Sequence, residues 1–102
     1  MMVKQMIIGA CRVSMHIPEN HSLKGKRQVV KSVIERVKHR FNVSIAEIDG
    51  NDLWQVATLG IACVSNDSHH VNEVLSNVVR FIETTRWEAV MTDYEIEILS
   101  AC

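Results

Sequence analysis

The sequence IIGACRVSMHI occupies residues 7–17 and is followed directly by PENH (18–21) and SLKGKRQVVKSVIERVKHRF (22–41). Within residues 7–17, apolar or small residues alternate with polar ones, and this period of two predicts a strand with one buried face. Pro18 and its polar neighbours are typical of a turn. Ser22 is a favourable N-cap, and apolar residues then recur at helical spacing, at Val30, Val33, Ile34, Val37 and Phe41. This stretch therefore predicts a strand, a turn and a long helix in succession.

The remainder of the chain predicts two more strands, a second helix and a last strand. We expect strands over residues 42–49 and 54–65, joined by the polar turn Gly50-Asn51-Asp52. Residues 65–67 offer N-cap side chains for a second helix, whose apolar stripe is Val71, Val74, Leu75, Val78 and Ile82. The last strand is expected over residues 89–99, where Tyr94, Ile96 and Ile98 alternate with Asp93, Glu95 and Glu97.

The order of these elements, β-α-β-β-α-β, defines the fold class. With right-handed crossovers it predicts an α+β ferredoxin-like sandwich, in which a four-stranded antiparallel sheet carries both helices on one face. A length of 102 residues allows one domain over residues 1–102, with its core over about residues 7–99. This architecture hosts enzymes, ligand sensors and RNA binders, so the fold alone assigns no function.

Composition and cysteine spacing exclude several classes of protein. Hydrophobic residues make up 47% of the chain and charged residues 23%, which is typical of a folded domain. The N-terminal apolar run is broken by Arg12, and no run approaches the ~20 residues of a membrane span, so we expect a cytoplasmic protein without membrane contact. Cys11, Cys63 and Cys102 form no Cys-x-x-Cys pair, and no residues have metal-ligand spacing. We therefore expect no metal and no cofactor.

The helix over residues 22–41 carries an unusual charge. It contains seven of the chain's eleven Lys and Arg residues, opposed only by Glu35, although the formal net charge of the chain is −1. Cations in the first turn oppose the helix macrodipole, which favours a bound anion there. On a helical wheel, four of the cations fall within roughly 60° and form a ridge. The predicted anion- or RNA-binding residues are Ser22, Lys24, Gly25, Lys26, Arg27, Lys31 and Lys38. The alternative is that long cations only solvate an exposed helix.

The sheet face turned away from the helices holds a secondary candidate site. Arg12, Ser14 and His16 project there from the first strand, and the carboxylates of the last strand are expected to face them: Asp93, Glu95 and Glu97. Arg12 and His16 are the secondary site residues, although opposite charges across strands more commonly stabilise the pairing. An acidic face poor in aromatic residues is a poor stacking platform for RNA bases.

The third predicted strand adds small and apolar residues to this open face: Thr58, Gly60, Ala62 and Val64. Such a surface favours a homodimer packed through the sheet, and an exposed face of small residues is the alternative reading.

Three strings of the sequence resemble one bacterial family. They are Ser22-Leu23-Lys24-Gly25-Lys26-Arg27, Phe41-Asn42-Val43-Ser44-Ile45-Ala46-Glu47, and Asp52-Leu53-Trp54-Gln55 with Ala57-Thr58-Leu59-Gly60 and Val64-Ser65-Asn66-Asp67. Together they are similar to the YlxP-like family of small proteins of unknown function, over about residues 7–99. The resemblance implies a ferredoxin-like fold. Because genes of this family often lie among those for transcription elongation, translation initiation and ribosome maturation, it also implies a role near the ribosome or its RNA. It implies no catalytic residues, and Gly25 departs from the charged or longer residue expected in the motif.

These observations lead to three functional hypotheses. The first is a non-catalytic binding protein that contacts RNA phosphates or a ribosomal particle through the basic ridge. The second is a phosphometabolite-binding sensor or enzyme that uses the N-terminus of the same helix, and the third is a homodimeric protein-interaction module. No positioned nucleophile, general base or metal cluster accompanies the basic helix, which favours the first hypothesis over an enzyme.

Overall fold

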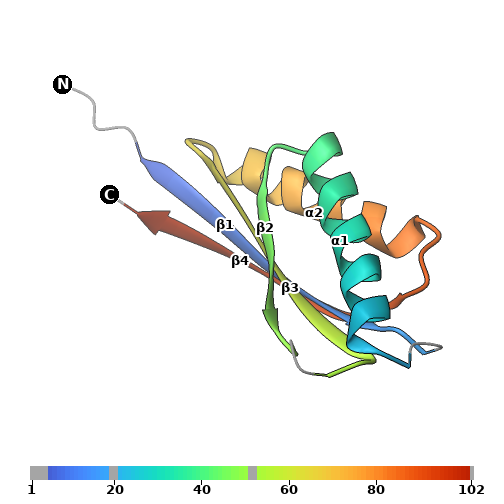
Figure 1. Cartoon of the computed structure of the whole chain (residues 1–102). Coiled ribbons are helices and arrows are strands. Elements are labelled where there is room, and N and C mark those ends of the chain that lie inside the picture. The colour runs from blue at the N-terminus through green and yellow to red at the C-terminus, as the bar shows by residue number, and fades with distance from the viewer. Residues whose placement is uncertain (1–4, 19–20, 51–52, 102) are drawn as a thin grey trace.

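The structure is a computed structural model that describes residues 5–18, 21–50 and 53–101. Its elements are β1 (Met6–His16), α1 (Leu23–Arg40), β2 (Ser44–Asp49), β3 (Val56–Ser65), α2 (Ser68–Thr84) and β4 (Val90–Ala101). The four strands form one antiparallel sheet in the order β2-β3-β1-β4, and the helices pack against it (Figure 1). The predicted α+β ferredoxin-like sandwich is therefore confirmed.

The core lies between the helices and the inner face of the sheet. Alternate residues of β1, among them Cys11, Val13 and Met15, are buried. Cys11 pairs with Ile61 on β3 and with Ile96 on β4, so the register places apolar side chains of three strands on the same face. Helix α2 lies across β1, β3 and β4, whereas α1 lies against β2. The basic helix therefore belongs to the β2 side of the sheet, and β4 is the opposite edge.

Both helices begin where the sequence predicts. The Gly25 N–H donates to Ser22 Oγ at 3.0 Å, which makes Ser22 the N-cap of α1. The His69 N–H donates to Asp67 Oδ1 at 3.0 Å, which makes Asp67 the N-cap of α2. These bonds satisfy backbone donors that have no partner within the helix.

The strand boundaries differ from the predicted ones by one to two residues. Strand β2 begins at Ser44 rather than at residue 42, β3 begins at Val56 rather than at 54, and β4 continues to Ala101. The connection before β3 is longer because Gly50 has a φ of +79° and its carbonyl accepts the Leu53 N–H at 3.0 Å, so a turn precedes the strand. The predicted turn residues 51 and 52 lie outside the described residues.

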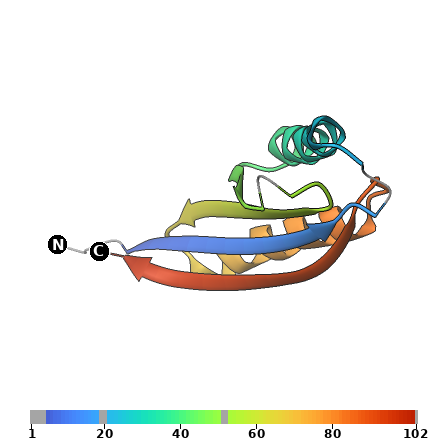
Figure 2. The ribbon, with the colours of Figure 1, turned by 60° about the horizontal axis from the view of Figure 1, so that its bottom comes forward.

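The ends of β1 and β4 project beyond the helices (Figures 1 and 2). The sheet is therefore longer than the layer that covers it, and part of β4 is left open. Within the described ranges, neither helix is long and apolar enough to cross a membrane.

Candidate functional site

Helix α1 exposes a row of cations along one flank. Lys24, Arg27, Lys31 and Lys38 are all exposed, and we call these four residues the basic ridge. At 1.5 Å per residue, the ridge is about 21 Å long from its first to its last member. The apolar stripe of the same helix turns Val30, Val33 and Val37 toward the core, which fixes the ridge on the outer side.

One carboxylate lies close to the basic ridge. Lys31 Nζ is 3.9 Å from Glu35 Oε1, and both side chains are largely exposed. An ion pair of this kind contributes little in water, because solvent screens it and two long side chains must be ordered. The charge of Lys31 therefore remains available to an anionic partner.

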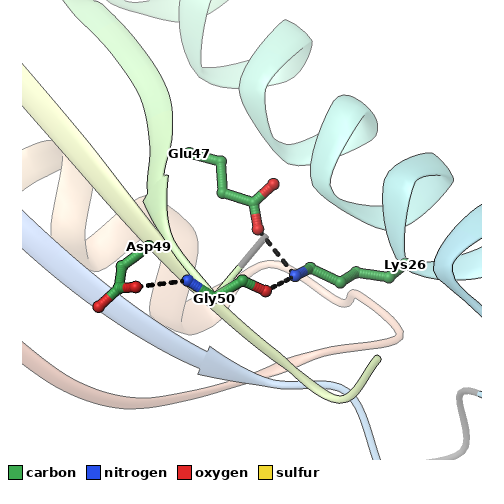
Figure 3. A network of polar contacts seen from close by, with 4 residues as sticks. All are labelled: Lys26, Glu47, Asp49 and Gly50. Carbon is green, nitrogen blue, oxygen red and sulfur yellow. Dashed lines mark hydrogen bonds and ion pairs between the residues drawn. The ribbon is translucent and has the colours of Figure 1, made fainter. Parts of the chain in front are cut away.

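Lys26 does not belong to the exposed surface. Only 1% of this side chain is accessible to solvent. Its Nζ lies 2.9 Å from Glu47 Oε2 and donates to the Gly50 carbonyl (Figure 3). The sequence-based assignment of Lys26 to the anion-binding residues is therefore wrong.

The burial of Lys26 has a simple geometric cause. It precedes Val30 by four residues and Val33 by seven, so it lies on the apolar stripe of α1 rather than on the ridge. Glu47 lies two residues after the buried Ile45 on β2, so it is on the same face of the strand and points toward α1 as well. The spacing of Lys26 with Val30 and Val33 therefore indicated a buried position, although a charged residue is expected at the surface.

The N-terminus of α1 is capped by Ser22. The Gly25 N–H donates to Ser22 Oγ, which occupies one of the backbone donors that have no partner within the helix. The Lys26 N–H donates to the Ser22 carbonyl at 3.1 Å, which is the first regular hydrogen bond of the helix. Gly25 is half-buried and lines a groove of about 700 Å³ between α1 and residues 86–90, together with Arg36 and Arg86.

Arg36 and Arg40 hold the two helices together on the flank opposite the basic ridge. The Arg36 guanidinium lies 4.7 Å from the centroid of the Trp87 ring, and that of Arg40 lies 4.9 Å from the Phe81 ring. Phe81 makes edge-to-face contacts with Phe41 at 5.7 Å and with Trp87 at 6.0 Å. Arginine stacked on aromatic rings retains its charge. Arg36 and Arg40 therefore extend the positively charged surface of α1 toward α2.

The secondary candidates lie on the open face of the sheet, where only part of the expected pairing occurs. Arg12 is opposite Glu95 on β4, as expected from opposite charges on neighbouring strands. His16 is opposite Val90 instead of a carboxylate, because the register shifts between Ser14 and Met15. A His–carboxylate acid–base pair is therefore not formed across these positions.

The open face also carries the small residues that favoured a homodimer. Ala10 is opposite Ala62, and Ala46 is opposite Gly60, and these residues line a shallow depression of about 610 Å³. Ile48 packs over Gly60, where a Cβ would lie 2.8 Å from Ile48 Cγ2. Dimerisation through this face stays a prediction.

Neither of the two described cysteines, Cys11 and Cys63, is activated as a nucleophile. Burial raises the pKa of the Cys11 thiol from 9.0 to about 11. Burial also raises the pKa of Cys63, against a smaller opposing effect of a hydrogen bond with the Gly9 backbone. In the part of the chain that the structure describes, no three His, Cys, Asp or Glu residues form a group that could hold a metal ion.

The fold and the cationic helix define a small α+β ferredoxin-like domain with one strongly basic surface. A family model described as "Protein of unknown function (DUF503)" matches residues 8–96, and the chain belongs to this family. It is 40% identical over 78 residues to "Uncharacterized protein YlxP" of Bacillus subtilis (strain 168), an alignment that covers 76% of this chain and 85% of that protein. The YlxP-like resemblance is thereby confirmed. Among solved structures, the chain is similar to "De novo designed protein Foldit4", with a TM-score of 0.47 and 14% identity over 95% of this chain and 97% of that one.

Proposed function

We propose that the protein is a non-catalytic RNA-binding protein, and that the basic ridge contacts phosphate groups of RNA, free or within a ribosomal particle in the cytoplasm. The observation that carries the proposal is the exposure of Lys24, Arg27, Lys31 and Lys38 along one flank of α1. No acidic residue lies in the first turn of this helix. Such contacts position a protein on a nucleic acid and carry little sequence information.

The length of the basic ridge favours a polyanion over a small ligand. Four cations over about 21 Å can each meet a different phosphate of one strand, whereas a single phosphometabolite spans only one or two of them. The alternative pocket at the N-terminus of α1 receives less support from the geometry. Ser22 Oγ occupies the Gly25 N–H there, and Lys26 turns into the core.

Salt dependence of binding tests the proposal. If the four ridge cations each neutralise one phosphate of a single-stranded RNA, the slope of log K against log salt is roughly −3. Fluorescence anisotropy with a labelled single-stranded RNA at 50–300 mM KCl measures this slope. Binding without salt dependence, or no binding at the lowest salt, would refute the proposal.

A pair of matched variants localises the contact. Lys24→Glu/Arg27→Glu reverses two ridge charges at exposed positions and should lower RNA affinity at least tenfold at low salt. Arg80→Glu/Arg86→Glu makes the same change in net charge outside the ridge and should lower it much less. Equal losses in the two variants would show that net charge alone, rather than the ridge, governs binding.

The phosphometabolite alternative predicts a different result. A small ligand bound only by the folded protein raises its melting temperature in proportion to the logarithm of ligand concentration. A thermal-shift screen of phosphate-containing metabolites, repeated with Arg36→Met/Arg86→Met, would detect a ligand in the groove beside Gly25. A specific shift that disappears in this variant would favour the alternative.

A further inference from the structure

Strand β4 presents a long free edge. It has twelve residues and is the outermost strand, next to β1 on one side only. In the first half of the strand, the Tyr94 N–H donates to Asp93 Oδ1 at 2.9 Å. The Asp93 side chain therefore already occupies this backbone donor. Residues 95–101 remain as a run of strand about 20 Å long. This is the length of an ordinary strand pair in a sheet.

The two faces of this edge differ in chemistry. Toward the helices, Tyr94 is 48% exposed and Ile98 is 37% exposed, so the helix layer does not cover these apolar side chains. On the open face, Glu95 is opposite Arg12, whereas Glu97 is opposite Ala10. Within the described chain, no ion pair engages either glutamate.

The protection of this sheet edge is only partial. Proteins prevent edge pairing with charged side chains on the edge, inward-pointing charges, prolines, bulges or very short strands. Residues 95–101 contain no proline, and their two charges, Glu95 and Glu97, lie on the open face, whereas Ile96 and Ile98 lie on the inner face. The edge therefore disfavours an acidic strand but leaves the backbone open to a basic one.

We propose that residues 95–101 of β4 bind, as a fifth strand, an extended segment of another protein in which Lys or Arg alternates with Val or Ile. The backbone groups of the edge supply the strand pairing. Glu95 and Glu97 face the basic side chains of the segment, while its apolar side chains lie beside Ile96 and Ile98 and extend the inner face.

The charges of β4 also bear on two other occupants. A second copy of β4 paired antiparallel about Ile96 would place Glu95 opposite Glu97, and like charges across strands destabilise this register. A pair centred on Ile98 would place Glu97 opposite Leu99, and light scattering tests for it below. RNA is repelled by the same carboxylates. The inference therefore does not depend on the proposed RNA-binding function, which uses α1 at the other side of the sheet.

A charge-swap experiment tests the strand addition. The probe is a fluorescent nine-residue peptide that alternates Lys with Val, and its counterpart alternates Glu with Val. The wild-type protein should bind the Lys peptide, and Glu95→Lys/Glu97→Lys should weaken this binding roughly tenfold or more and bind the Glu peptide instead. Glu73→Lys/Glu83→Lys makes the same charge change on exposed positions of α2 and should leave binding unchanged. Glu97→Lys alone, next to Ala10 rather than Arg12, provides a milder variant whose fold is not in question, with a smaller loss expected.

Backbone methylation of the peptide separates strand pairing from simple charge attraction. A strand exposes the N–H groups of alternate residues on opposite edges. Of two Lys peptides, one N-methylated at every Val and the other at every Lys, one should therefore bind and the other should not. Equal binding of both peptides, equal loss in Glu73→Lys/Glu83→Lys, or a β4-mediated dimer of the wild-type protein in light scattering would overturn the proposal. Loss of RNA binding in Lys24→Glu/Arg27→Glu has no bearing on this result, so the two proposals fail separately.

Discussion

The buried ion pair between Lys26 and Glu47 allows a quantitative test of how α1 is attached to the sheet. In Lys26→Met, a methionine of similar length replaces a cation that is 1% exposed, and Glu47 keeps its charge while only 16% exposed. Breaking a buried pair by removing one partner costs about 3–5 kcal/mol, because the remaining charge is desolvated without compensation. Since water still reaches part of Glu47, we expect a loss near the lower limit, about 3 kcal/mol. For a domain of this size, this corresponds to a melting temperature lower by roughly 10–20 °C.

The double variant separates the charge effect from the loss of packing. Lys26→Met/Glu47→Leu removes both charges, and such replacements of buried pairs are often neutral or stabilising. The Gly50 carbonyl keeps a partner in the double variant, because it also accepts the Leu53 N–H. We therefore expect the double variant to lie within about 1 kcal/mol of the wild-type protein, which gives a coupling energy of about 2 kcal/mol or more across the cycle.

Urea unfolding followed by tryptophan fluorescence measures the four free energies of the cycle, and RNA binding of the same variants provides an independent check. Lys26→Met should retain the RNA affinity of the wild-type protein, since its side chain does not reach the surface. The reasoning is refuted if Lys26→Met leaves stability unchanged and lowers RNA affinity as strongly as Lys24→Glu/Arg27→Glu. That result would place Lys26 on the basic surface.

Three further predictions follow from the packing, the thiols and the helix cap. Gly9→Ala should destabilise the protein by about 1–3 kcal/mol, because its Cβ would lie 2.3 Å from Val71 Cγ1; Val71→Ala in the same chain should restore part of the loss in urea unfolding. In a Cys63→Ser/Cys102→Ser background, Cys11 should react with a thiol reagent at pH 8 far more slowly than an unshifted thiol, since its pKa is about 11. The unfolded chain releases this proton near pH 9 while the folded chain holds it to about pH 11, so folding stability should fall as the pH rises between these values; fast labelling without unfolding would contradict the burial. Ser22→Ala should cost about 1 kcal/mol through loss of the bond from the Gly25 N–H, whereas Ser22→Asp should not, as thermal unfolding can show.

The fold was predictable from the sequence because its signals are local. The alternation in β1, the Ser22 and Asp67 caps and the apolar stripes of both helices each involve residues within one element. The position of Lys26 was predictable in principle from the same stripe, but burying a lysine is costly unless a partner is present. That partner, Glu47, lies on another element, and the period of β2 alone does not show that the two side chains meet.

The surroundings of the other site residues depend on contacts that no local pattern encodes. His16 lies opposite Val90 because of a register shift in one strand pair. Arg36 reaches Trp87 across the space between α1 and the segment after α2, more than forty residues along the chain. Spacing rules place a side chain on a face of its own element, and packing between elements decides what that face contacts.

The strand order separates the positive and the negative residues of the chain in space. Helix α1 lies against β2, so most of the chain's cations lie at one edge of the sheet, while Glu95 and Glu97 lie on β4 at the other edge. With β3 and β1 between them, the two edge strands are about 14 Å apart, more than a Debye length at physiological salt. The two surfaces therefore act on partners independently even though the net charge is nearly zero. A polyanion is attracted on the α1 side and repelled on the β4 side, which restricts the orientation in which it approaches. A basic protein segment would experience the opposite field, so the two proposed partners, RNA and a protein segment, would contact separate surfaces of the domain.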